Sequence, residues 1–356
     1  MRFRAAFLIV VLAGCDRVVG IGDPYADAPS GDAPRDGAAS YRKTITITSP
    51  APSALAEFPL SILIDNDPDL KAHAPSRTNI SFADAAGNHL GCEIVRYDQT
   101  TGSLDAWVRV PSIPANPETL TIDLVYGDTQ TPCGGTEAWP QEARAVWHSN
   151  LAVDRTLDST AHGNELITYM GRGVPSSTAG LVGEALSFDG GDTLCTENAT
   201  GDGSLDFGTG SFAFSLWIYE RRALATYDAP LAKNGATGFV IYTGMAPWSV
   251  QFLDGASTQL AIQPQTLGAW INITVVVDRA AMLMRPYRDG VAGTSLSISS
   301  VGSLTSDGPA CLSKNFIDGN IDEARIFAGA LSPSWIQASY VNIAQRSQMI
   351  SIGPEN

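Results

Sequence analysis

The sequence lacks the motifs that usually mark an enzyme. It contains only four histidines among 356 residues, and no H-E-x-x-H pair is present to bind a catalytic zinc. It has no G-x-S-x-G nucleophile elbow, no P-loop and no G-x-G-x-x-G fingerprint. The string E-x-D-x-x-E, with which some glycosidases present paired carboxylates along one strand, is also missing. We therefore expect no catalytic residues and no enzymatic activity.

Positive charge is also scarce. The chain has 22 Lys and Arg residues against 37 Asp and Glu residues, which gives a formal net charge of -15. A surface this negative repels phosphate backbones and gains nothing from an anionic membrane face. We therefore expect no nucleic-acid partner. Acidic loops are, by contrast, what a hard cation such as calcium prefers.

Long hydrophobic runs are lacking except at the beginning of the sequence. There, two arginines precede the apolar residues 5–14, which is the arrangement of an export signal. Ten residues of helix reach only about 15 Å, half of the hydrocarbon thickness of a bilayer, so this run is too short to span a membrane. It ends in LAGC, which resembles the bacterial lipobox, whose cysteine receives a diacylglycerol and becomes the first mature residue. We predict a lipoprotein signal peptide at residues 1–14 and lipidation of Cys15, with an ordinary secretory signal as the alternative.

The next segment, residues 15–40, is poor in large apolar side chains and rich in Ala, Asp, Gly, Pro and Ser. Such a segment buries too little surface to offset the entropy of ordering it, so we predict a flexible stalk. A coil of this length spans on the order of 25–30 Å, which lifts a domain clear of the lipid headgroups. The predicted location is therefore the bacterial cell envelope, with a lipid anchor in a membrane. Both the outer membrane with the cell surface and the periplasmic face remain open.

From residue 41 onward, apolar and polar side chains alternate. The alternation is clear in TITIT, PLSILID, LDAWVRV and TLTIDLVY, and turn residues separate these segments. Short alternating strands of this kind predict an antiparallel β-sandwich over residues 41–135. The only short helix that we expect in it is Asp67–Ala74.

This first domain resembles a family of bacterial surface proteins known only as a domain of unknown function, number 2341. The resemblance is carried, in family order, by YRKTITIT, FPLSILID, ISFADAAGNHLGCEIVRYD, AWVRVPSIPA and LVYGD, which run from Tyr41 to Asp128. It implies a fold and no activity.

The second half, residues 145–356, shows the same alternation followed by a helix. GSFAFSLWIYE, WINITVVVD and NIDEARIF predict strands, and Asp289-Gly290 predicts a hairpin turn because both residues tolerate positive φ. LSPSWIQASYVN predicts a helix, with Ser332 as its N-cap and Pro333 as its first residue.

These segments resemble the laminin-G-like, concanavalin-A-like jelly roll of bacterial surface proteins. The matching stretches are AVWHSNLA, DSTAHGNEL, GEALSFDGGD, GSFAFSLWI, AWINITVVVD, YRDGVAG and GNIDEARIFAGALSPSWIQASY, and the last is the most specific. The predicted fold class is therefore all-β, with two tandem antiparallel β-sandwiches of which the second is a jelly roll.

The jelly-roll resemblance implies calcium as a cofactor. It points to ligands in an early loop, after one strand and on a late strand, namely Asp158, Asn164, Asp189, Asp192 and Asp322. The alternative is that these residues form turns and accept backbone N–H groups. We expect the neighbouring Glu323 to be solvated or paired with Arg325.

Exposed aromatic side chains would mark a glycan platform, because sugar rings stack on flat apolar faces. The candidates are Tyr227, Tyr242 and Trp248, and the alternative for each is packing in the core or at an edge. The tryptophans that fall in strand patterns are expected in the core: Trp107, Trp147, Trp217 and Trp270.

Four cysteines besides Cys15 remain in a chain predicted to be exported. Three pairings are possible. We favour Cys92 with Cys133 and Cys195 with Cys311, because each pair then falls inside one predicted domain. The alternative is four buried free thiols.

Three functions fit these observations. The first is a tethered binding or adhesion module for a glycan or a protein partner. The second is a structural subunit of an envelope or surface assembly. A polysaccharide-acting enzyme is the third, and the missing carboxylate pattern disfavours it. The fold by itself does not decide among them.

Overall fold

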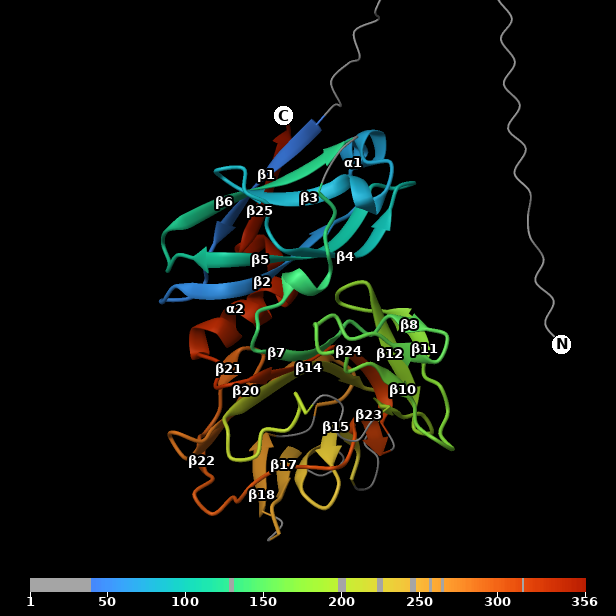
Figure 1. The fold of residues 1–356 in the computed structure, drawn as a ribbon, viewed down its shortest axis with the longest axis vertical. Coiled ribbons are helices and arrows are strands. Elements are labelled where there is room, and N and C mark those ends of the chain that lie inside the picture. The colour runs from blue at the N-terminus through green and yellow to red at the C-terminus, as the bar shows by residue number, and fades with distance from the viewer. Residues whose placement is uncertain are drawn as a thin grey trace, which may run out of the picture. The chain divides into compact units, whose positions relative to one another are not determined.

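The computed structural model describes residues 40–127, 131–197, 203–222, 227–243, 248–255, 258–263, 266–315 and 317–356. Residues 38–356 belong to one compact unit. Antiparallel strands dominate it, as the all-β prediction required (Figure 1). The predicted signal peptide, Cys15 and nearly all of the stalk lie outside the described residues.

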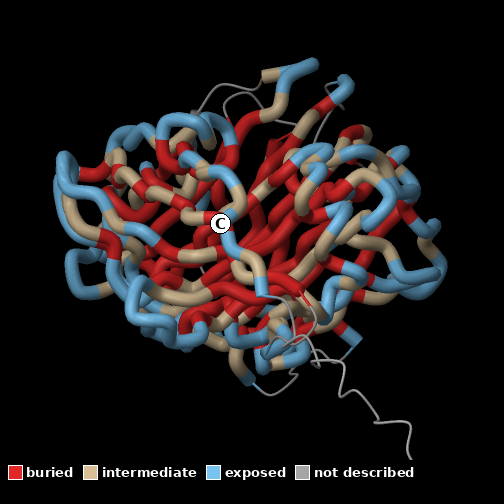
Figure 2. The backbone as a smooth tube through the Cα atoms, turned by 90° about the horizontal axis from the view of Figure 1, so that it is seen from above, coloured by how far each residue is buried: buried red, intermediate tan, exposed pale blue. Residues whose placement is uncertain are grey.

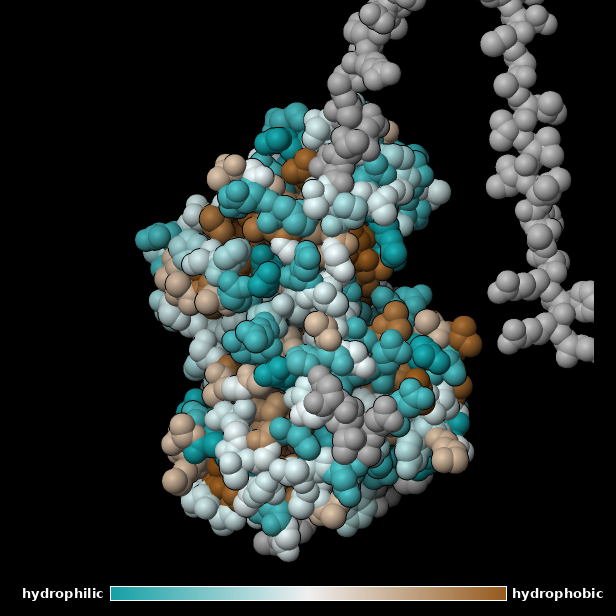
Figure 3. All heavy atoms as spheres, in the orientation of Figure 1, coloured by the Kyte–Doolittle hydropathy of each residue, from teal (hydrophilic) through white to brown (hydrophobic). Residues whose placement is uncertain are grey.

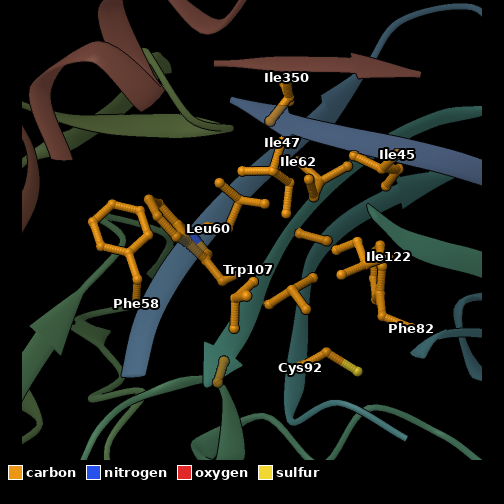
Figure 4. Packing of buried hydrophobic residues seen from close by; sticks show 14 of the residues in the cluster. Ile45, Ile47, Phe58, Leu60, Ile62, Phe82, Cys92, Trp107, Ile122 and Ile350 are labelled. Carbon is orange, nitrogen blue, oxygen red and sulfur yellow. The ribbon is translucent and has the colours of Figure 1, made fainter. Parts of the chain in front are cut away.

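The first domain is a sandwich of two sheets, with the strand orders β25-β1-β6-β3 and β2-β5-β4. Its strands are β1 (Ser40–Thr48), β2 (Leu55–Ile64), β3 (Ile80–Asp84), β4 (Cys92–Asp98), β5 (Ser103–Ile113), β6 (Thr119–Gly127) and β25 (Ile350–Glu355). The alternating side chains that the sequence pointed to one face do meet between the sheets. Figure 4 shows Ile45, Ile47, Leu60, Ile62 and Ile122 gathered there, and all are buried.

The short helix of this domain is α1 (Pro68–His73), flanked by the 3-10 turns η1 (Arg77–Asn79) and η2 (Thr136–Ala138). Asp67 caps α1, because its carboxylate accepts the N–H groups of Asp69 and Leu70. The predicted helix is thus confirmed.

The second domain is a jelly roll of two larger sheets. The outer sheet has the order β18-β17-β16-β15-β23-β13-β10-β9-β8. Its strands are β8 (Leu151–Ala152), β9 (Arg155–Thr156), β10 (Leu166–Thr168), β13 (Leu194–Thr196), β15 (Ala229–Asn234), β16 (Gly238–Tyr242), β17 (Trp248–Leu253), β18 (Thr258–Gln263) and β23 (Ala310–Asn315).

The inner sheet has the order β11-β12-β24-β14-β19-β20-β21, with β7 beside β24 and β22 beside β20. Its strands are β7 (Ala143–Trp147), β11 (Ser176–Ala179), β12 (Glu184–Asp189), β14 (Phe212–Glu220), β19 (Trp270–Asp278), β20 (Leu283–Arg288), β21 (Val291–Ala292), β22 (Leu296–Ser297) and β24 (Asp318–Ala328). The hairpin turn predicted at Asp289-Gly290 is present between β20 and β21, and both residues have positive φ.

The core of the jelly roll lies between these two sheets. The inner sheet contributes Phe212, Phe214 and Leu216, and the outer sheet contributes Phe239 and Ile241. Figure 2 shows the buried segments concentrated in the interior and the exposed ones in the surrounding loops. Of the tryptophans predicted in cores, Trp107, Trp147 and Trp217 are buried and Trp270 is half-buried.

Helix α2 (Pro333–Ala344) lies between the inner sheet and the first sandwich (Figure 1). Ser332 caps it by accepting the N–H of Trp335, as predicted. The Trp335 ring contacts Phe58 of β2 and Phe327 of β24, with ring centroids 5.4 and 5.1 Å away. The helix therefore covers the face of the inner sheet that points away from the jelly-roll core. It is followed by the 3-10 turn η3 (Arg346–Gln348).

The last strand does not belong to the second domain, which corrects the predicted boundary of 145–356. β25 pairs with β1 of the first sandwich, with Ile45 opposite Ile352 and Ile47 opposite Ile350. The physical reason is that β1 has one side paired with β6 and needs a partner on the other. A six-residue strand carries no local signal of its distant partner.

Both predicted disulfides are present. Cys92 bonds to Cys133 in the first domain, and Cys195 bonds to Cys311 across β13 and β23 of the second. Among the residues described, no helix has the length and apolar character needed to cross a membrane.

Candidate functional site

The structure does not gather the predicted calcium ligands around one point. Asp158 accepts the N–H groups of Val146, Thr160 and Asn164 at 2.8–2.9 Å, so it holds its own loop together. Burial raises the pKa of this carboxyl group. The side-chain amide of Asn164 donates to the carbonyl of Arg144 and to the hydroxyl of Ser204.

The other predicted ligands also accept backbone N–H groups. Asp189 accepts from Gly191, and Asp192 accepts from Asp189, which is a turn arrangement. Asp322 accepts from Leu181 and Val182. Over the described part of the chain, no three His, Cys, Asp or Glu side chains form a group that could hold a metal ion. Calcium binding therefore stays a prediction.

A cluster of buried charges joins the two domains. His148, which follows β7, places Nδ1 2.7 Å from Glu323 of β24 and Nε2 3.1 Å from Glu93 of β4. Arg325 donates to the second oxygen of Glu323 at 2.6 Å. Burial alone would lower the pKa of His148, but the two carboxylates raise it to about 10. We call these four residues the interdomain charge cluster.

Aromatic rings of the first domain enclose this cluster. The Arg325 guanidinium lies 4.3 Å from the ring centroid of Trp107 and 5.0 Å from that of Trp139. The indole N–H of Trp139 and the hydroxyl of Ser159 donate to the two oxygens of Glu93. The side chain of His148 is only 4% exposed and both of its nitrogens are engaged. The cluster has the residue types of an acid–base site, but its charges are engaged with one another and His148 and Glu323 are buried. Glu93 is 16% exposed and lines a hollow of about 280 Å³. We interpret the role of the cluster as structural because its ion pairs join the two domains.

Of the two alternatives predicted for Glu323, solvation or pairing with Arg325, the second is confirmed. The salt bridge is present and the side chain is buried. Glu323 has a φ of 49° and lies at a β-bulge, where the pairing of β24 with β14 shifts by one residue. A bulge re-aims a side chain, and here it turns a carboxylate toward His148.

The three predicted aromatic residues behave differently from one another. Tyr227 is 54% exposed and Tyr242 is half-buried, and their rings meet edge to face with centroids 5.5 Å apart. Trp248 is fully buried in the jelly-roll core, so its prediction as an exposed ligand contact was wrong. The reason is the alternation along β17, which sends Trp248, Val250 and Phe252 inward.

A hollow of about 540 Å³ lies at the end of β10 in the outer sheet, and both apolar and polar side chains line it. Its lining residues are Ile167, Thr168, Tyr169, Met170, Cys195, Thr196, Glu197 and Pro309. We call this hollow, together with Arg172 and Lys314 beside it, the β10 site.

A tight turn presents the exposed side chains of the β10 site. The N–H of Arg172 donates to the carbonyl of Tyr169. Gly171 has a φ of 78°, and glycine is favoured at this position of the turn because it adopts positive φ easily. Tyr169 is 42% exposed and Met170 is 92% exposed at the tip. Figure 3 shows several separate hydrophobic side chains among hydrophilic ones on the surface over the region of β8, β10 and β11.

A second β-bulge brings a cation to the same place. The pairing of β15 with β23 shifts so that Ser313 and Lys314 stand opposite a single residue, and Ser313 has a φ of 51°. The Lys314 ammonium lies 5.1 Å from the ring centroid of Tyr169. Burial and the neighbouring Arg172 both lower the pKa of Lys314. Among the described residues, no carboxylate forms an ion pair with it.

The sequence analysis did not identify Tyr169, Met170 or Lys314. The turn sequence Tyr-Met-Gly-Arg was a usable local signal, because a glycine follows two large side chains there. No local signal connects it with Lys314, which is brought near by pairing of β10, β13 and β23. Tyr242 lies four strands from β10 in the same sheet, about 19 Å away at the usual strand spacing.

Comparisons with solved structures give only distant likenesses. The chain is similar to the binding domain of Paraclostridial Mosquitocidal Protein 1, with 16% identity, a TM-score of 0.47 and coverage of 56% of this chain and 52% of that one. The receptor binding domain of botulinum neurotoxin D is 14% identical, with a TM-score of 0.44 and coverage of 56% of this chain and 52% of that one. Domain 4 of AbnA, an arabinanase from Geobacillus stearothermophilus in complex with arabinotriose, is 18% identical. Its TM-score is 0.44, and the match covers 55% of this chain and 97% of that one. The chain thus spans about half of the length of the two toxin domains. We draw nothing about ligands from likenesses at this level.

Family models match both halves of the chain. Residues 76–136 match a domain of unknown function, DUF2341, and residues 189–337 match Laminin_G_3, described as the concanavalin A-like lectin/glucanases superfamily. No curated protein matches the chain significantly. Together with the two sandwiches observed, these matches show that the chain carries a DUF2341 domain followed by a laminin-G-like, concanavalin-A-like jelly roll.

Proposed function

We propose that this protein is a tethered binding module whose ligand site is the β10 site of the jelly roll. The observation that carries the proposal is an open hollow with an exposed tyrosine ring, a neighbouring cation and polar side chains. Ligand sites combine an apolar wall with a few polar groups in this way. The outward face of the inner sheet is less accessible to a ligand, because α2 and the first sandwich cover it.

A glycan is the ligand that we favour. Sugar rings stack on aromatic faces, and their hydroxyl groups need nearby hydrogen-bonding partners. Tyr169 supplies the ring, and Thr168, Thr196 and Glu197 supply polar atoms on the walls of the hollow. The tyrosine pair formed by Tyr227 and Tyr242 lies farther along the same sheet and would contact a longer ligand.

A glycan array with the full-length chain in detergent tests this proposal. The wild type should bind a defined set of glycans, and Tyr169→Ala should lose about two- to twelvefold in affinity, as stacking energies of about 0.5–1.5 kcal/mol imply. Val291→Ala is the matched control, because Val291 is 71% exposed on the inner sheet, away from the β10 site. Equal binding by the wild type and Tyr169→Ala would contradict the assignment of the site.

A structural subunit of a surface assembly is the second candidate. One observation favours it, namely that several exposed large apolar residues fall in a short stretch: Val153, Leu157, Tyr169, Met170 and Val174. Gentle detergent extraction from the native membrane should then give a complex of fixed stoichiometry. A clean monomer would exclude this candidate and leave the binding module.

The tether itself is part of the proposal. We propose that Cys15 carries the lipid and holds the protein in the bacterial cell envelope, with residues 15–40 as the stalk. The LAGC sequence after a short apolar run supports this. Cys15→Ser should abolish incorporation of labelled palmitate and leave an uncleaved precursor. Processing at the same position in the serine variant would contradict the lipid anchor.

Calcium remains a proposed ligand of the second domain, with Asp158, Asn164, Asp189, Asp192 and Asp322 as candidates that lie at separate places in the described structure. Binding to the folded state alone adds about 2.7 kcal/mol when calcium stands at a hundred times its dissociation constant. The melting temperature should then be several degrees higher with calcium than with chelator. An unchanged melting temperature would leave these residues in the turn roles that their hydrogen bonds already define.

A further inference from the structure

One cation of the β10 site, Lys314, stands out in an acidic protein. The net charge is -15, and several other described cations form ion pairs: Arg42, Lys43, Arg96, Arg109, Arg155, Arg221 and Arg325. Lys314 forms none with the described carboxylates. Its ammonium instead lies over the Tyr169 ring and feels the charge of Arg172.

A partly buried ammonium that forms no ion pair with the described carboxylates bears a desolvation cost, and an anionic ligand beside it offsets that cost. The bulge that places Lys314 adds a second cost, since Ser313 adopts a left-handed conformation that residues other than glycine rarely take. The fold therefore keeps a partly buried cation in a strained segment, over the ring of Tyr169, which lines a ligand-sized hollow.

We propose that the β10 site recognises an acidic sugar, with Lys314 receiving its anionic group while Tyr169 stacks on its ring. This inference rests on the proposed binding function and names its ligand class. Carboxylated and sulfated sugars share the required chemistry, a negative charge attached to a ring with an apolar face. Glu197 is exposed and lines the same hollow, so its carboxylate should weaken the binding of such a ligand, and this effect can be tested by mutation.

The test uses the full-length chain in detergent and two pairs of polysaccharides with identical backbones. The pairs are polygalacturonate with its methyl ester, and dextran sulfate with dextran. We expect binding to one charged member at least about tenfold tighter than to its neutral counterpart, the size of one hydrogen bond to a charged group. That affinity should fall as sodium chloride is raised, because screening weakens charge attraction. Binding that prefers the carboxylated or the sulfated member identifies the anionic group.

Variants then assign the charges. Lys314→Met keeps the hydrocarbon stem and should remove most of the preference for the charged member over the neutral one. Glu197→Gln should strengthen binding to the charged member. Lys71→Met is the control, because it removes an equal charge from the exposed surface of α1 in the first domain. Thermal melting verifies that each variant is folded.

The outcomes separate the two proposals. Equal affinity for charged and neutral members, insensitive to salt, overturns the acidic-sugar proposal but leaves the β10 site as a neutral-glycan site if Tyr169→Ala abolishes binding. Weaker binding by Glu197→Gln also overturns it, since the carboxylate would then be a ligand contact. An absence of binding to these four polysaccharides and across the glycan array overturns both.

Discussion

Two β-bulges in the jelly roll place charged side chains in opposite situations. The bulge at Glu323 turns its carboxylate inward, where His148 and Arg325 neutralise it in the buried region between the domains. The bulge at Lys314 places its ammonium over the ring of Tyr169, which lines an open hollow, and its other described neighbours are Cys311 Sγ and Arg172. A buried charge with partners stabilises one arrangement of the chain, whereas an accessible charge without a counter-ion is suited to a ligand. Changing each bulge in turn tests this contrast.

The largest effect is expected from Glu323→Gln. It leaves His148 and Arg325 buried with one carboxylate between them, and breaking a buried ion pair of this kind costs about 3–5 kcal/mol. The free energy of unfolding, measured in urea, reports the loss. Glu165→Gln is the control, because Glu165 forms an exposed pair with Arg155 and should change stability by no more than about 0.5 kcal/mol. Similar losses in both variants would contradict the structural role of the cluster.

The pH dependence of the same cluster should have two limbs. Burial would raise the pKa of Glu93 and of Glu323, but His148 lowers both, so their stabilisation is complete above the unfolded value near 4.3 and is lost as the pH falls through the lower folded value. The raised pKa of His148 has the reverse sign. Its stabilisation is complete below the unfolded value near 6.5 and is lost as the pH rises toward about 10.

The difference in unfolding free energy between the wild type and His148→Gln isolates this dependence. It should be greatest between about pH 5 and 6.5 and should shrink toward both extremes. A difference that stays constant from pH 4 to pH 10 would show that His148 contributes packing and not charge.

Asp322→Asn should have a smaller effect than its neighbour. Burial, followed by the charge of Glu323, raises the pKa of Asp322 well above its ordinary value, so the neutral form is the one that folding favours. The amide oxygen of asparagine can still accept the N–H groups of Leu181 and Val182. We expect a loss of about 1 kcal/mol or less in urea unfolding. A loss as large as that of Glu323→Gln would mean that Asp322 is charged in the folded protein.

The smallest effect on stability is expected from Lys314→Met. This ammonium is partly buried beside Arg172 and has no described ion pair. Removing it should therefore change the unfolding free energy by no more than about 0.5 kcal/mol, and a small increase in stability would also fit. The same variant should change ligand binding, which Glu323→Gln should not. A destabilisation above about 1 kcal/mol would place Lys314 with the structural charges and remove the contrast.

The sequence predicted those parts of the fold that are encoded locally. Period-two alternation located the strands, Ser332 and Pro333 located α2, and the domain positions of the cysteines led to both disulfides. It did not predict that β25 pairs with β1, because the two strands are separated by almost the entire folded chain.

The candidate site was predictable only in part, for the same reason. Tyr227 and Tyr242 were proposed as a ligand contact and do meet, but Trp248 faces the core, because the alternation alone does not say which face of β17 is covered. Lys314 and Tyr169 come together through three paired strands and a bulge. A bulge shifts the face on which every later side chain lies, and nothing in the surrounding residues announces it.

The contact between α2 and β2 has a consequence for self-association. β2 is a ten-residue, largely apolar strand at the edge of its sheet, and such an edge can template pairing with a second molecule. The side-chain amide of Asn342 accepts the N–H of Ser61 at 2.7 Å and donates to its carbonyl at 3.1 Å, as a neighbouring strand would do. One asparagine thus occupies the place where another copy would begin a cross-β contact. A blocked edge therefore keeps two copies of the chain from joining their sheets through β2.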